Sequence, residues 1–130
     1  MPGIAGISHL SLSVSDAAAS ARWYADVLGF ADRITLEGDT YVRRVCMHES
    51  GLVIGLQQHQ GNDGTPFDPT RAGLDHLSFA VPDRATLEAW ADHLAALGVK
   101  HSPPEDTGRG FALSFRDPDD IQLELFSPPA

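Results

Sequence analysis

Cysteine, basic side chains and long apolar runs are all scarce in this sequence of 130 residues. Its single cysteine, Cys46, allows no intrachain disulfide, which is consistent with a reducing compartment. Nine Lys and Arg against 18 Asp and Glu give a formal net charge of −9, which disfavours nucleic acid and membrane surfaces as partners. No apolar run approaches the roughly 18 residues of a spanning helix, and the first residues lack a signal-peptide pattern. We therefore expect a cytoplasmic protein without a disulfide framework.

The most informative feature that is present is an internal repeat. Residues 6–16 (GISHLSLSVSD) return sixty-seven positions later as residues 73–83 (GLDHLSFAVPD), with a histidine at the same place in both copies. A self-match at a fixed offset is typical of a duplicated supersecondary unit. Further matched pairs are Trp23 with Trp90 and, at an offset of sixty-nine, Gly29 with Gly98 and Gly55 with Glu124.

The length predicts one domain, residues 1–130, which contains both copies. We expect module one over residues 4–58, a linker rich in Gly, Asn, Asp and Pro over 59–70, and module two over 71–128. Each module is predicted to run strand, helix and then three further strands.

The helix boundaries are marked by capping residues. Ser15 or Asp16 is placed to cap the first helix, and Asp83 is placed to cap the second. Gly29 and Gly98 are placed to end these helices. The remaining strands are expected at 31–36, 41–47 and 52–57 in module one and at 99–102, 111–116 and 121–126 in module two, with a loop over 103–110.

The alternation of side chains along the strands predicts where three polar residues lie. If the helices cover the apolar strand faces, the opposite faces line a concave interior that carries His9 and His76. In the last strand Leu123 and Leu125 share one face, so Glu124 points to the other. We therefore expect an α+β fold in which duplicated βαβββ modules form a curved cup of mixed sheets with the helices outside.

Two imidazoles and one carboxylate on a shared face form a ligand set for a divalent metal ion. Such a site acts as a Lewis acid and as a template for substrate oxygens. Taken singly, a strand histidine is more often a hydrogen-bonded residue, and a strand glutamate is usually solvated. The symmetric placement of His9 and His76, together with the parity of Glu124, favours the metal site. Asp75, beside His76, is expected to project from the other face.

These motifs resemble the vicinal oxygen chelate superfamily, which contains glyoxalase I, extradiol dioxygenases, fosfomycin thiol transferases and bleomycin-resistance proteins. The likeness extends from Ile4 to Pro128. By this resemblance, metal ligands lie on the first and last strands of each module. The motifs that carry the likeness are SHL at 8–10, WY at 23–24, LGF at 28–30, DHL at 75–77, FRDPDD at 115–120 and LEL at 123–125.

Gly55 departs from the glyoxalase I pattern, in which Glu or Gln occupies that ligand position. Because a proton carrier is lost there, the ordinary glyoxalase I reaction is disfavoured. The remaining His, His, Glu set resembles that of extradiol dioxygenases and of fosfomycin thiol transferases. Residues 108–115 lack the Ser- and Tyr-rich stretch of the latter enzymes, which makes fosfomycin a poor candidate substrate.

The resemblance thus implies a metal-dependent lyase, isomerase or extradiol-type dioxygenase. Its small substrate would chelate the metal through neighbouring oxygens, and Glu124 would be the catalytic residue. Fe²⁺ suits the ligand set, and Mn²⁺, Ni²⁺, Zn²⁺ or Co²⁺ would serve lyase or isomerase chemistry. A metal-free, ligand-sequestering protein of the bleomycin-resistance type and a metal-free interaction domain are the alternatives. The presence of the ligand trio argues against the sequestering protein.

Arg43 and Tyr41 are the candidate substrate-binding residues. Arg43 lies on the strand face opposite to that of Cys46, so its guanidinium can point inward and hold a substrate carboxylate. The alternative is an arginine that points into solvent. The resemblance to extradiol dioxygenases implies a histidine and a tyrosine near the bound oxygen, and Tyr41, His48 and His59 are the candidates. The simpler interpretation is that Tyr41 is an ordinary strand residue and that the two histidines lie in turns. The resemblance also implies a homodimer, whose cup is completed within one chain or by exchange of modules.

Overall fold

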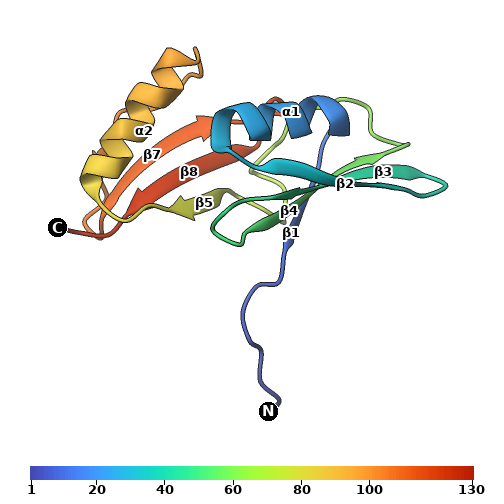
Figure 1. Ribbon diagram of the computed structural model, residues 1–130, viewed down its shortest axis with the longest axis horizontal. Coiled ribbons are helices and arrows are strands. Elements are labelled where there is room, and N and C mark those ends of the chain that lie inside the picture. Colours follow the sequence, from blue (N-terminus) through green and yellow to red (C-terminus); the bar gives the residue numbers. More distant parts are fainter. The chain divides into compact units, whose positions relative to one another are not determined.

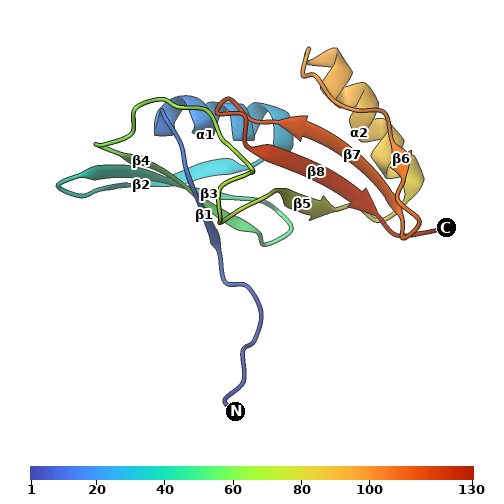
Figure 2. The same ribbon diagram turned by 180° about the vertical axis from the view of Figure 1, so that it is seen from behind.

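The computed structural model describes all 130 residues and divides them into two compact units, Met1–Thr65 and Pro66–Ala130. Each unit contains one helix and one four-stranded sheet, and Figures 1 and 2 together label these elements. Neither helix is long and apolar enough to cross a membrane.

Unit 1 is built on a mixed sheet with the strand order β1-β4-β3-β2. Strands β1 and β4 are parallel, and the other neighbours are antiparallel. The helix packs across β2, β3 and β4, and so covers one face of the sheet (Figure 1). The elements of this unit are β1 (Leu10–Ser13), α1 (Ala17–Leu28), β2 (Ala31–Glu37), β3 (Tyr41–Met47) and β4 (Val53–His59).

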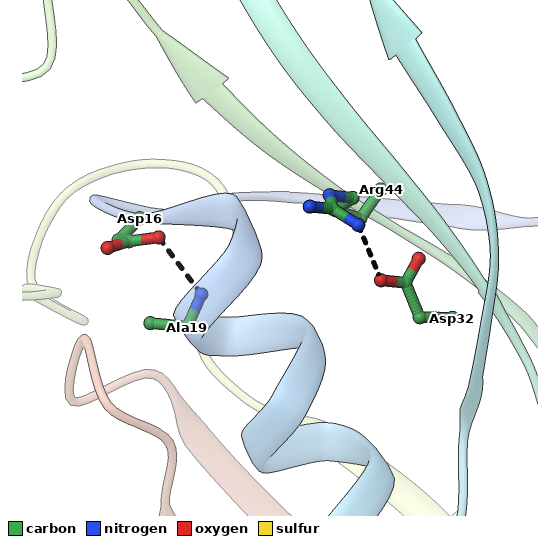
Figure 3. A network of polar contacts seen from close by, with 4 residues as sticks. All are labelled: Asp16, Ala19, Asp32 and Arg44. Atoms are coloured by element: carbon green, nitrogen blue, oxygen red, sulfur yellow. Dashed lines mark hydrogen bonds and ion pairs between the residues drawn. The ribbon is translucent and has the colours of Figure 1, made fainter.

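The predicted capping residues set the ends of α1. The Asp16 carboxylate accepts a hydrogen bond of 2.9 Å from the backbone N–H of Ala19 (Figure 3). Gly29 ends the helix with a φ of +77°, a left-handed conformation that glycine adopts without steric cost. Leu12 of β1 and Val14, which directly follows this strand, are buried together with Tyr24 of the helix in the core of the unit.

A thiol is buried on the side of the sheet that carries an ion pair between β3 and β2. Arg44 Nη1 lies 2.8 Å from Asp32 Oδ2 (Figure 3). Cys46 is fully buried two residues further along β3. Burial raises the pKa of its thiol to about 11, and Asp32 adds to this effect while Arg44 opposes it. The thiol is therefore protonated at neutral pH.

Unit 2 repeats this topology with the strand order β5-β8-β7-β6, in which β5 and β8 are parallel. Its helix contacts β7 and β8, and Figure 2 shows the short edge strand β6 from behind. The two βαβββ units confirm the predicted α+β fold of duplicated modules. The elements are β5 (Leu77–Ala80), α2 (Arg84–Ala96), β6 (Glu105–Asp106), β7 (Phe111–Arg116) and β8 (Gln122–Ser127).

The strand predicted at 99–102 does not form, and this expectation was wrong. Only His101 makes an isolated bridge, to Phe115, and the short β6 lies instead within the expected loop at 103–110. Pro103 and Pro104 explain the difference, because proline has no N–H to donate to a ladder and so interrupts the pairing.

The turn between β7 and β8 is fixed by a buried carboxylate. Asp117 is 5% exposed and accepts hydrogen bonds from the backbone N–H groups of Asp119 and Ile121, at 2.8 and 2.9 Å. Asp120 completes the turn with a φ of +62°. This turn sets the register in which β8 begins, and so decides which of its side chains face the helix.

Candidate functional site

The parallel strand pairs of the two units have the same register. Ser11 lies opposite Gly55 in unit 1, and Ser78 lies opposite Glu124 in unit 2. Ser11 and Ser78 are equivalent residues of the sequence repeat. Gly55 and Glu124 therefore occupy equivalent positions, as the offset between the two copies predicts.

Glu124 lies in the middle of β8 on the face that is turned away from the core. Its neighbours Leu123 and Leu125 are 1% and 2% exposed, whereas Glu124 itself is half-buried. The hydroxyl of Ser78, on the adjacent strand, donates a hydrogen bond of 2.8 Å to Glu124 Oε1. The carboxylate is thus oriented by its neighbour, and its second oxygen remains available for a ligand.

His9 and His76 each stand one residue before the first strand of their module, and the residue before each imidazole holds its Nδ1. Asp75 Oδ1 lies 2.7 Å from His76 Nδ1, and Ser8 Oγ lies 3.0 Å from His9 Nδ1. The position predicted for Asp75 was wrong, because strict alternation applies only inside a strand and β5 begins at Leu77. A carboxylate accepts a hydrogen bond from Nδ1–H, which keeps the proton on Nδ1 and leaves the Nε2 lone pair of a neutral His76 available to a metal.

A cavity of about 730 Å³ in unit 2 is lined by both His76 and Glu124. A second imidazole, half-buried His101, lines the same cavity, and its Nδ1 lies 2.7 Å from the Ser102 carbonyl oxygen. Because a carbonyl oxygen can only accept, Nδ1 carries the proton and Nε2 is the proton-accepting atom of the neutral ring. The remaining lining residues are Lys100, Ser114, Phe115, Arg116, Asp117, Asp120, Gln122 and Leu123.

Sequence reasoning missed His101. The available signal was a histidine in the segment expected to pair with the strand at 111–116, but only the register of the bridge to Phe115 places it at this cavity. A propensity pattern does not fix that register.

The equivalent surface of unit 1 forms a smaller cavity of about 240 Å³, and no carboxylate lines it. A Cβ added at Gly55 would lie 2.5 Å from Ser11 Oγ and 3.5 Å from Arg43 Cδ. The Ser11 hydroxyl and the Arg43 stem therefore fill the space into which a longer side chain at Gly55 would extend. The lining residues are Ser8, His9, Ser11, Arg43, Val45, Val53 and Gly55.

The two candidate substrate-binding residues lie at different places in unit 1. Arg43 lines the same cavity as His9, donates a 2.6 Å hydrogen bond from Nε to Gln57 Oε1, and has its guanidinium carbon 5.8 Å from the centre of the Tyr41 ring. Tyr41 lines a separate hollow at the other end of β3, together with His59.

The remaining histidine of unit 1 is engaged in a turn. His48 lies between β3 and β4, and its Nδ1 is 2.8 Å from Ser50 Oγ. Its ring centre is 5.1 Å from that of Phe30. This is the simpler role considered for it from the sequence.

The three predicted metal ligands belong to different units. His76 and Glu124 share the cavity of unit 2, whereas His9 lines the cavity of unit 1. Neither unit by itself gathers three His, Cys, Asp or Glu side chains into a metal-binding group. The donor types fit a divalent metal ion, because two imidazole nitrogens and one carboxylate leave positions for substrate oxygens.

Comparisons with known proteins agree with this architecture. The family model of the glyoxalase/bleomycin resistance protein/dioxygenase superfamily matches residues 6–125. The chain is 30% identical over 135 residues to the uncharacterized protein YaeR of Escherichia coli K12, covering 97% of this chain and 98% of YaeR. It is 26% identical over 126 residues to the manganese-dependent 2,3-dihydroxybiphenyl 1,2-dioxygenase of Geobacillus genomosp. 3, covering 95% of this chain but only 36% of that enzyme.

A solved structure shows the same fold. The glyoxylase/bleomycin resistance protein/dioxygenase domain from Frankia sp. EAN1pec superposes with a TM-score of 0.92 at 37% identity, covering 98% of this chain and 100% of that domain. The resemblance carried by the repeated histidine motif is thereby confirmed. The chain belongs to the glyoxalase/bleomycin resistance protein/dioxygenase superfamily.

Proposed function

We propose that this protein is a divalent-metal-dependent enzyme in which His9, His76 and Glu124 hold the metal and a small substrate chelates it through neighbouring oxygens. The observation that carries the proposal is the unit 2 cavity, which both His76 and Glu124 line and beside which each has a hydrogen-bonding partner. Such outer partners, here Asp75 and Ser78, orient metal ligands and fix the tautomer of a ligating histidine.

The expected metal is Fe²⁺ or Mn²⁺ for a dioxygenase, or Ni²⁺, Zn²⁺ or Co²⁺ for a lyase or isomerase. When bound, such an ion supplies Lewis-acid polarisation of the chelated oxygens. Gly55 supports the dioxygenase reaction over the glyoxalase I reaction. A side chain that could carry a proton between substrate carbons in glyoxalase I is absent at this position. The relative named as a manganese-dependent dioxygenase supports the same choice.

The side chains of this protein have distinct roles in the proposed site. Ser78 holds the Glu124 carboxylate toward the cavity, and Asp75 keeps the Nδ1 proton on His76. His101 presents a proton-accepting Nε2 to the same cavity and accepts a proton from a substrate hydroxyl. His9 completes the ligand set from unit 1.

We further propose a cytoplasmic homodimer, an assembly that is common in this superfamily. His9 then comes from the same chain or from the second copy. The single free Cys46, buried and protonated, is compatible with a reducing compartment.

The experiment reconstitutes metal-free protein separately with Fe²⁺, Mn²⁺, Ni²⁺, Zn²⁺ and Co²⁺ and measures turnover of a catechol panel and of methylglyoxal hemithioacetal. We expect metal-dependent cleavage of a catechol, reduced at least about a hundredfold in Glu124→Gln, which keeps the side-chain shape without the charge. His93→Ala removes an exposed imidazole from α2 and serves as the control that retains activity. Turnover that persists without metal, or in Glu124→Gln, contradicts the proposal. Tight binding of a flat ligand by metal-free protein, without turnover, would instead indicate a sequestering protein.

A further inference from the structure

Arg43 is a cation without an anionic partner in a protein that has twice as many acidic as basic residues. The ion pairs of the structure involve Arg44, Arg71, His76 and Arg84, and Arg43 takes part in none of them. It is nevertheless half-buried in the cavity of unit 1, where no carboxylate lines the wall. Because a guanidinium binds planar carboxylates and none lines this wall, its position fits a carboxylate that is not part of the chain.

The guanidinium of Arg43 is held in place by its neighbours. Its Nε donates to Gln57 Oε1 at 2.6 Å, and its carbon atom lies 5.8 Å from the centre of the Tyr41 ring. These contacts occupy Nε and leave the two terminal nitrogens of the guanidinium available. Terminal guanidinium nitrogens can bind a carboxylate through two parallel hydrogen bonds.

The duplicated unit lacks this arrangement. In unit 1, Val45 lies opposite Gly55 and, two residues along, Arg43 lies opposite Gln57. In unit 2 the same register pairs Ser114 with Glu124, and then Ala112 with Phe126. An arginine and glutamine pair in one copy thus corresponds to an apolar pair in the other, so the cation is a feature of unit 1 and not of the fold. The unit with the cation is also the one in which the carboxylate is replaced by glycine.

From these observations we infer that the cavity of unit 1 is a carboxylate subsite, and that the substrate is a small organic acid with vicinal oxygens and a separate carboxylate. Arg43 binds the carboxylate, while Val45 and Val53 in the cavity wall contact the carbon skeleton. His9 lines the same cavity, which brings a proposed metal ligand and the cation into one binding surface. The assignment of vicinal oxygens rests on the proposed function, whereas the carboxylate subsite rests on the residues of unit 1 alone.

The test compares three probes that differ in one group: 3,4-dihydroxybenzoate, 3,4-dihydroxybenzamide and catechol. Their dissociation constants are measured by calorimetry with Mn²⁺-loaded protein. We expect the acid to bind about ten- to a hundredfold more tightly than the amide, as bidentate ionic hydrogen bonds imply. Arg43→Gln should remove this preference, and Arg43→Lys should restore part of it. Arg33→Gln, an exposed arginine on β2, is the control with the same loss of charge.

Equal affinities of the acid and the amide in the wild-type protein would overturn the inference, and so would an undiminished preference in Arg43→Gln. A second measurement separates this inference from the proposed function. Benzoate is titrated into metal-free protein, where we expect weaker binding that still depends on Arg43. If no metal binds but this dependence holds, the subsite stands and the proposed function fails. If catechol binds through the metal without a preference for the acid, the proposed function stands and the subsite fails.

Discussion

Two hydrogen bonds of different strength hold the candidate ligand imidazoles, so their removal should have unequal effects on metal binding. His76 Nδ1–H donates to the Asp75 carboxylate at 2.7 Å, whereas His9 Nδ1 lies 3.0 Å from the neutral Ser8 hydroxyl. Hydrogen bonds with a charged partner contribute about 1.5–3 kcal/mol, and neutral ones contribute about 0.5–1.5 kcal/mol.

Because both hydrogen bonds are exposed to solvent, their free-energy contributions are expected at the lower end of these two ranges. The side chains of His76 and Asp75 are 47% and 72% exposed, so water competes for the bond between them. Asp75→Ala should therefore weaken metal binding by about 1.5 kcal/mol, or roughly tenfold. Ser8→Ala should weaken it by about 0.5 kcal/mol, or roughly twofold.

The assay is a competition titration of Mn²⁺ and Zn²⁺ against a chromophoric chelator. Asp92→Ala, an exposed carboxylate on α2, controls for the loss of a negative charge and should bind metal like the wild-type protein. Urea denaturation of the metal-free variants should show changes within about 0.5 kcal/mol, because the altered side chains lie at the surface. Equal losses in Asp75→Ala and Asp92→Ala, or a larger loss in Ser8→Ala than in Asp75→Ala, would refute the reasoning.

Three further predictions concern the proton acceptor, the buried thiol and a helix cap. His101→Asn should lower turnover about 10²- to 10⁴-fold with unchanged metal content, and turnover at the wild-type rate would contradict the role. Because burial raises the pKa of Cys46 from 9.0 to about 11, the native thiol should resist a disulfide reagent at pH 8, whereas the urea-unfolded thiol should react. The folded state retains this proton, so stability to urea should fall as the pH rises from 9 towards 11, and a pH-independent midpoint would contradict the shift. Asp16→Ala should lower the free energy of unfolding by about 1 kcal/mol in the same assay, because the Ala19 N–H loses its acceptor, and an unchanged value would exclude the cap.

The duplication made much of the fold predictable from the sequence. The offset between the copies placed Gly55 and Glu124 at equivalent positions, and the strand registers agree. Alternation placed Leu123 and Leu125 toward the core and Glu124 away from it, because a two-residue period is a property of any regular strand. The helix ends followed from capping chemistry at Asp16 and Gly29.

The errors arose where structure depends on partners rather than on local pattern. Residues 99–102 were expected to form a strand as the counterpart of residues 31–36, but two prolines follow and only His101 makes a bridge. Asp75 contacts His76 because both lie outside the strand, where alternation no longer applies. His101 escaped notice because its place at the cavity comes from a single bridge to Phe115. The proposed metal site would need His9 from one unit and His76 and Glu124 from the other, and neither periodicity nor spacing predicts such an arrangement.

Elemental analysis of protein purified without a metal-affinity tag tests the central claim most directly. The wild-type protein and His93→Ala are expected to carry about one divalent metal ion per chain, and His76→Ala is expected to lose it, since binding requires the neutral imidazole. A wild-type protein that carries no metal after growth in metal-replete medium, or a His76→Ala variant that keeps its full complement, would contradict the account.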